Sequence, residues 1–116
     1  RCTSLIEVQI PDSVTSIGRV AFIGCAALTQ VQIPKCVTSI GNSAFKDCTS
    51  LAGVQIANSV TTIGSCAFKG CTLLTNVHIP DSLASVGHCV FEDCTSLVEV
   101  QIPDCVTTIG SLGLKI

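Results

Sequence analysis

Residues 2–24 read CTSLIEVQIPDSVTSIGRVAFIG, and four related copies of this 23-residue unit follow, so that five copies fill residues 2–116. Columns of identical residues recur at the same interval. They are Cys2, Cys25, Cys48, Cys71 and Cys94; Leu5, Leu28, Leu51, Leu74 and Leu97; Val8, Val31, Val54, Val77 and Val100; Ile10, Ile33, Ile56, Ile79 and Ile102; Gly18, Gly41, Gly64, Gly87 and Gly110; and Phe22, Phe45, Phe68 and Phe91. A period of this length is typical of a solenoid, in which stacked units share one core. We expect residues 1–116 to form a single domain of five rungs.

The unit contains recognisable local patterns. Residues 8–10 alternate apolar, polar and apolar, which predicts a half-buried strand, and Pro11 ends it because proline lacks the N–H that a strand ladder needs. Residues 14–17 indicate a second extended or turning segment, and Gly18 permits a tight corner. Residues 21–25 indicate one turn of 3₁₀- or α-helix, too short to be stable alone.

Composition excludes several classes of protein. Apolar residues make up 47% of the chain and charged residues 12%, a balance that rules out intrinsic disorder. A net charge of −2 lacks the basic footprint that nucleic-acid binding requires. The apolar runs are short, so we expect no transmembrane segment.

The run I-P-x-x-V-T-x-I-G-x-x-A-F-x-x-C, at residues 10–25 and 33–48, resembles the BspA-like, or Treponema pallidum-type, class of leucine-rich repeats. This resemblance covers the whole chain, with departures at Ala57, Val90 and Gly113-Leu114. It implies a leucine-rich repeat solenoid with a parallel β-sheet on its concave side. The convex side would carry short 3₁₀ or helical turns and extended segments. It also implies adhesion or protein–protein contact, at a cell surface or after secretion.

The nine cysteines do not indicate a disulfide framework. Five form the column before Thr-Ser-Leu, where parallel Cα–Cβ vectors would strain a disulfide, so we expect reduced core thiols facing backbone carbonyls. Cys36 and Cys105 share a column but lie three rungs apart, too far to pair. Cys66 and Cys89 occupy adjacent rungs of one loop column, and either a bridge or two free thiols fits them. Reduced cysteines also leave an intracellular compartment open.

No residue pattern indicates catalysis, a metal site or a cofactor. The His88-Cys89 dipeptide has no acid or amide placed to orient the histidine, and adjacent residues generally point apart. The sequence contains no C-x-x-C pair that would bind zinc, and His78 lies on the strand segment, away from the glycine corner. We therefore expect no enzymatic activity.

The polar face of the predicted strands is the candidate interaction surface. It comprises Glu7, Gln9, Gln30, Gln32, Gln55, Asn76, His78, Glu99 and Gln101. Two interpretations are open: the amides hydrogen-bond one another along the stack, as in Asn and Gln ladders, or they recognise a protein partner. This face lacks Trp, Tyr and Arg, the residues that dominate binding hot spots, so we expect contacts that are broad, polar and modest.

The ends of the chain suggest a second function. Residues 109–116 are mostly apolar, and neither end has the polar cap that solenoids need. We expect the ends to be covered by further repeats of a longer chain or by other subunits. The alternative function is therefore a structural accessory subunit that contacts its assembly through its ends and convex side, including Leu114 and Ile116.

Overall fold

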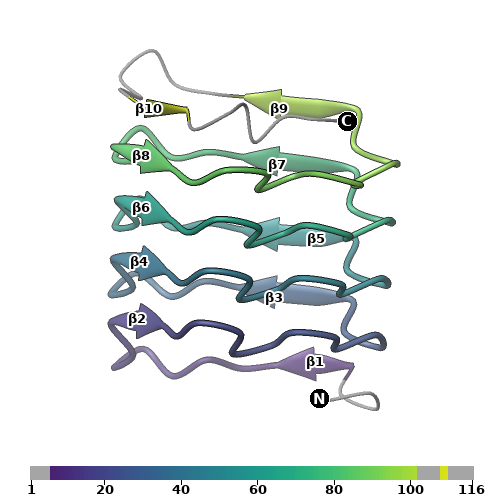
Figure 1. Ribbon diagram of the computed structural model, residues 1–116. Helices are drawn as coiled ribbons and strands as arrows, with labels where there is room; N and C mark the ends of the chain where they lie inside the picture. Colours follow the sequence, from purple (N-terminus) through teal and green to yellow (C-terminus); the bar gives the residue numbers. More distant parts are fainter. Residues whose placement is uncertain (1–5, 102–107, 110–116) are drawn as a thin grey trace.

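The computed structural model of the protein describes residues 6–101 and 108–109, which form two parallel sheets along one stack (Figure 1). The first sheet contains β1 (Glu7–Val8), β3 (Gln30–Gln32), β5 (Gly53–Gln55), β7 (Asn76–His78) and β9 (Glu99–Gln101). The second contains β2 (Ser16–Ile17), β4 (Ser39–Ile40), β6 (Thr62–Ile63), β8 (Ser85–Val86) and β10 (Thr108–Ile109). Partners in adjacent strands lie one 23-residue repeat apart, as Val31 and Val54 do, so the predicted solenoid with a parallel sheet is confirmed.

The second sheet is more regular than its sequence indicates. Residues 14–17 indicate only an extended or turning segment, whereas Ser16 and Ile17 open a continuous five-stranded sheet. Each strand of this sheet has two residues, and its isoleucine or valine points into the core where burial is described. Two-residue strands have no stability by themselves, so stacking holds this sheet together.

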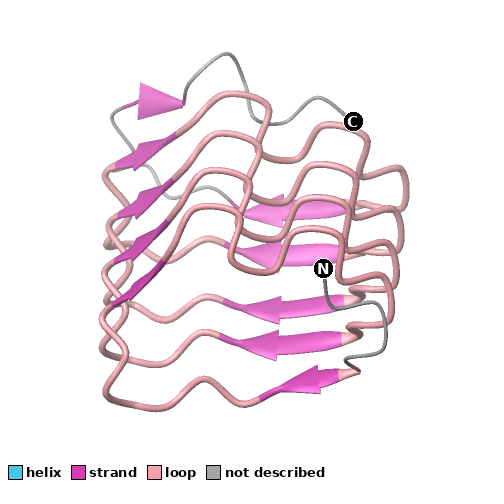
Figure 2. Ribbon diagram, turned by 60° about the horizontal axis from the view of Figure 1, so that its bottom comes forward, coloured by secondary structure: helices cyan, strands magenta, loops and turns pink. Residues whose placement is uncertain are grey.

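The expected helical turn at residues 21–25 and at its equivalents is wrong, because the described residues contain no helix (Figure 2). Successive backbone N–H groups instead alternate between acceptors in their own turn and acceptors in the next rung. Those of Ala44, Lys46 and Cys48 donate to carbonyls three residues earlier, whereas those of Ser43, Phe45 and Asp47 donate to Ser65, Ala67 and Lys69 of the next rung. We call these inter-rung bonds the turn ladder. A helix needs consecutive local bonds, and the neighbouring rung takes every second donor.

Positive backbone φ angles make this alternation possible. Ser43 has a φ of 58° and Asp47 of 62°, and Cys66 and Cys89 repeat the Ser43 conformation at 60° and 57°. The same column places Val20 at 53°, which is unusual for a β-branched residue. The turn therefore includes left-handed backbone that helix propensity cannot reveal.

The core is a set of identical side chains stacked along the solenoid. Ring centroids of successive phenylalanines from Phe22 to Phe91 lie 5.2, 5.3 and 5.9 Å apart, with interplanar angles of 8°, 2° and 9°. Leucine, valine and isoleucine columns are buried around them. The core predicted from the repeat columns is confirmed in the described rungs.

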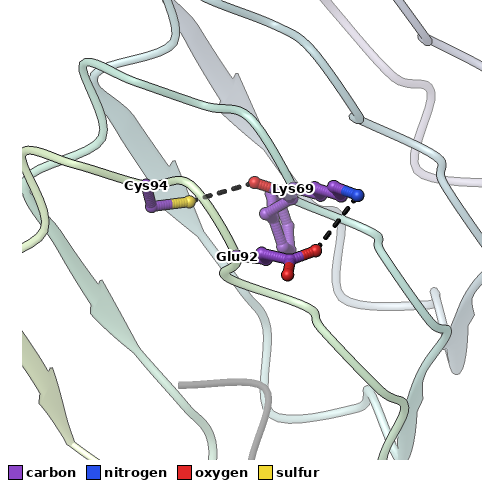
Figure 3. A network of polar contacts seen from close by, with 4 residues as sticks. Lys69, Glu92 and Cys94 are labelled. Atoms are coloured by element: carbon purple, nitrogen blue, oxygen red, sulfur yellow. Dashed lines mark hydrogen bonds and ion pairs between the residues drawn. The ribbon is translucent and has the colours of Figure 1, made fainter. Parts of the chain in front are cut away.

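The column cysteines are buried thiols that face backbone oxygens, as expected. The sulfur atoms of Cys48, Cys71 and Cys94 donate to the carbonyls of Phe22, Phe45 and Phe68 at 3.2, 3.3 and 3.1 Å (Figure 3, for Cys94). Burial raises the pKa of the Cys71 thiol well above its usual range and that of Cys94 to about 11. Cys2 lies outside the described residues.

The glycine corners let the rungs approach backbone to backbone. A Cβ atom added to Gly41 would lie 2.6 Å from the Arg19 nitrogen, and one added to Gly64 would lie 2.5 Å from the Asn42 nitrogen. A Cβ on Gly18 would meet nothing within 4 Å. Glycine is therefore required where the backbone of the preceding rung packs against the corner.

Candidate functional site

The outer surface of the first sheet gathers the predicted interaction residues on one face. Glu7, Gln9, Gln30, Gln32, Gln55 and His78 are exposed there, and we call these six the glutamine face. Asn76, Glu99 and Gln101 belong to β7 and β9 of the same sheet, but their side chains lie outside the described part of the structure. Alternation along each strand produces the face, since Val31 is buried between exposed Gln30 and Gln32.

Strand register sets the spacing of the face. Gln32 pairs with Gln55 and Gln55 with His78, so each rung adds one polar side chain to a straight row. The row beside it contains Gln30, Gly53 and Asn76, where Gly53 leaves a gap between polar side chains. Parallel strands lie about 4.8 Å apart, so the rows repeat at that interval.

A shallow hollow of about 460 Å³ lies over the N-terminal half of this face. Its lining includes Glu7, Gln30 and Gln55 from the strands. Asp12 and Lys35, from the turns that follow the strands, also line it and bring charges of both signs. These two residues are absent from the predicted face. Their position directly after the strand column is the signal that could have identified them.

Side chains on the two sheets differ in their hydrogen bonding. Within residues 6–101, no hydrogen bond joins the amides of Gln9, Gln32 and Gln55 to one another. On the second sheet's side, the hydroxyl of Thr38 donates to the Thr15 carbonyl at 3.3 Å, and that of Thr61 to the Thr38 carbonyl at 3.1 Å. The threonine row uses its donors along the stack, whereas the glutamine row presents donors and acceptors to solvent.

An ion pair stands apart from this face, on the turn side of the molecule. The Nζ atom of Lys69 lies 3.0 Å from Oε1 of Glu92 in the next rung (Figure 3). Its hydrogen bond to Glu92, together with the carboxylate charge, raises the pKa of Lys69. Surface pairs of this kind contribute little to stability.

The residues considered for catalysis or metal binding are not gathered into a site. His88 is exposed and Cys89 is half-buried at the corner of the fourth rung, whereas His78 belongs to the glutamine face. Among the described residues, no group of three or more His, Cys, Asp or Glu side chains could hold a metal ion. The same part of the chain contains no helix long and apolar enough to cross a membrane.

A known family and several solved structures resemble this arrangement along most of the chain. A family model described as BspA type leucine rich repeat region matches residues 1–113, in six copies. No curated protein sequence matches the chain at a significant level.

Three solved bacterial structures share the fold. A leucine-rich repeat protein from Bacteroides ovatus is 38% identical over 90% of the chain, with a TM-score of 0.86. A Treponema pallidum leucine-rich repeat protein is 35% identical over 95%, with a TM-score of 0.91. A leucine-rich cell surface protein from Faecalibacterium prausnitzii is 31% identical over 95%, with a TM-score of 0.90. The chain spans 30%, 54% and 29% of these three proteins, less than two thirds of each.

Proposed function

We propose that the chain, which belongs to the BspA-type leucine-rich repeat family, is a non-enzymatic module that binds a protein partner through its glutamine face. Repeat proteins of this architecture are generally interaction or adhesion modules. The observation that carries the proposal is the exposed row of Gln9, Gln32 and Gln55, whose amides do not bond one another in the described rungs.

The chemistry of the face favours a particular kind of partner. Each amide offers an N–H₂ donor and a C=O acceptor, and the row repeats every 4.8 Å or so. An extended polar segment of a partner, with its own alternating donors and acceptors, matches this surface better than an apolar helix does. Because none of the six residues of the face is Trp, Tyr or Arg, we expect affinity to come from many weak contacts.

A cell-surface location is the setting we propose for this module. Support comes from the Faecalibacterium prausnitzii relative, which is described as a cell surface protein. Adhesion to another protein at that surface is the finer function that we infer. The competing function is the structural accessory subunit, which would use the ends and the convex side in place of the glutamine face.

The test compares two matched double variants. Gln32→Arg with Gln55→Arg changes two adjacent rungs of the glutamine face. Thr38→Arg with Thr61→Arg changes the same two rungs directly before strands β4 and β6 of the other sheet. Both pairs of positions are exposed. Proteins captured by the immobilised chain are identified by quantitative mass spectrometry, and the most enriched one is purified for affinity measurement.

We expect the glutamine-face variant to bind that protein at least about tenfold more weakly, a change of about 1.4 kcal/mol. The threonine variant should bind as the unchanged chain does. If the glutamine-face variant keeps its affinity while changes at Leu114 or Ile116 abolish it, the accessory-subunit function replaces this proposal.

A further inference from the structure

We propose that Cys66 and Cys89 form a paired thiol site, which a small-molecule disulfide of the glutathione class oxidises to a disulfide between the third and fourth rungs. The two residues are half-buried thiols in the same column of adjacent rungs. They lie on the turn segments, so the site is separate from the glutamine face and does not depend on the proposed function.

The backbone gives both cysteines the same conformation one rung apart. Their φ angles are 60° and 57°, and the Cys66 N–H donates to the His88 carbonyl at 2.9 Å. Each carbonyl accepts the N–H three residues later, from Lys69 at 3.2 Å and from Glu92 at 3.3 Å. Equivalent residues of adjacent rungs lie about 4.8 Å apart, inside the range of about 4.4–6.8 Å between Cα atoms that a disulfide needs.

The two rungs also approach closely on both sides of the pair. Before the cysteines, a Cβ added to Gly87 would lie 2.6 Å from the Ser65 Cα, so the corners pack backbone on backbone. After them, Lys69 and Glu92 meet across the same gap in an ion pair of 3.0 Å. Their parallel Cα–Cβ vectors leave the two Cβ atoms about one strand spacing apart, so a disulfide requires them to approach by about 1 Å. Half-buried turn residues can make that shift, whereas the fully buried column cysteines are held by the core around them.

The other cysteines differ from this pair in ways that make the oxidation selective for Cys66 and Cys89. Cys71 and Cys94 are fully buried, donate to backbone carbonyls and have pKa values raised by burial, so little reactive thiolate forms. Cys36 is exposed, but its column neighbours are Ser13 and Ser59, so its column has no second thiol in an adjacent rung. It is a natural single-thiol control.

The reaction is two successive thiol–disulfide exchanges. The thiolate sulfur of one cysteine attacks oxidised glutathione, which breaks its S–S bond, releases one glutathione thiolate and leaves a mixed disulfide on the protein. The second cysteine's thiolate then attacks the protein-bound sulfur and releases the second glutathione. The protein loses two electrons and two protons, and one oxidised glutathione becomes two reduced molecules.

The experiment treats the folded chain with oxidised glutathione in the absence of denaturant. Intact-mass and peptide mass spectrometry then locate each modification, while circular dichroism confirms that the fold persists. We expect a peptide cross-linked between Cys66 and Cys89 to dominate at these two positions. Cys36 should carry a glutathione adduct instead, and dithiothreitol should reverse both changes.

Single variants distinguish a paired site from two independent thiols. Cys66→Ser and Cys89→Ser should each convert the remaining cysteine of the pair into a glutathione adduct. The serine at position 43 of the same column, with a φ of 58°, shows that the turn accommodates this replacement. Cys36→Ser should remove only its own adduct.

Separate glutathione adducts on Cys66 and Cys89 in the unchanged chain would overturn the proposal. So would unmodified thiols at both positions while Cys36 reacts, or a cross-link that forms only after denaturation. None of these outcomes bears on binding by the glutamine face.

Discussion

The first and third rungs have nearly the same sequence pattern but very different surroundings. In rung 3, which comprises residues 48–70, Phe68 is fully buried between two other rings at 5.3 and 5.9 Å. In rung 1, residues 2–24, Phe22 is half-buried and stacks on one ring at 5.2 Å. The contrast teaches that the sequence motif does not determine burial here. Each residue is protected by the rung on either side of it.

Removing one ring from the phenylalanine stack tests this contrast and should have the largest effect on the free energy of unfolding. Phe68→Ala should lower the free energy of unfolding by about 4 kcal/mol, because it removes a buried ring and leaves a cavity. Phe22→Ala should lower it by roughly half as much, since the ring is already partly exposed. Urea unfolding followed by circular dichroism measures both, and Phe68→Leu serves if the alanine variant does not fold. Equal losses would contradict the contrast.

Substitutions at the glycine corners make the same comparison between rungs 3 and 1, with a smaller expected change in the free energy of unfolding. Gly64→Ala forces a methyl group against the Asn42 backbone, so the free energy of unfolding should fall by about 1–3 kcal/mol. Gly18→Ala enters open space and should change it by no more than about 0.5 kcal/mol. The same urea titration measures both. A comparable loss at Gly18 would show that its environment in solution is closed.

The smallest expected effect is a gain of stability in the first rung. Val20 is 44% exposed and holds a φ of 53°, a conformation that β-branched residues rarely adopt. Val20→Asn should raise the free energy of unfolding by about 1 kcal/mol, because asparagine tolerates left-handed backbone. Ser43→Asn, at the equivalent position of rung 2, is the control and should give a smaller gain. Thermal unfolding checks both, and no gain at Val20 would mean that its strain is absent.

Much of the fold could be predicted because its information is repeated. One strand pattern and one core column, read five times, were enough to place Val31 inside, Gln32 outside and the Cys48 sulfur against a carbonyl. The turn segment could not be predicted in this way. Its conformation depends on inter-rung bonds such as that from Phe45 to Ala67, which local helix propensity does not describe.

The position of the candidate site could be predicted from the sequence, but the hydrogen bonding of its side chains could not. Strand alternation puts Gln9, Gln32 and Gln55 on one face, and the structure agrees. Whether their amides bond along the row depends on side-chain torsions, about which a residue pattern contains no information. The sequence likewise does not decide whether Cys66 pairs with Cys89, because a column gives only the separation of rungs and not the local backbone angles.

The one-way direction of the turn ladder gives the turn side of the stack a local electrical polarity. Inter-rung bonds at the glycine corners, such as that from Gly41 to Ile17, run the other way. In the described residues, every bond of the turn ladder runs from an N–H of one rung to a C=O of the next, from Val20 to Asn42 at one end and from Gly70 to Glu92 at the other. Peptide dipoles aligned in this way add, as they do along an α-helix, but with the opposite sense relative to chain direction. On the turn side, the negative pole therefore lies at rung 1. Cationic groups are favoured there, and anionic groups are favoured toward the last rungs.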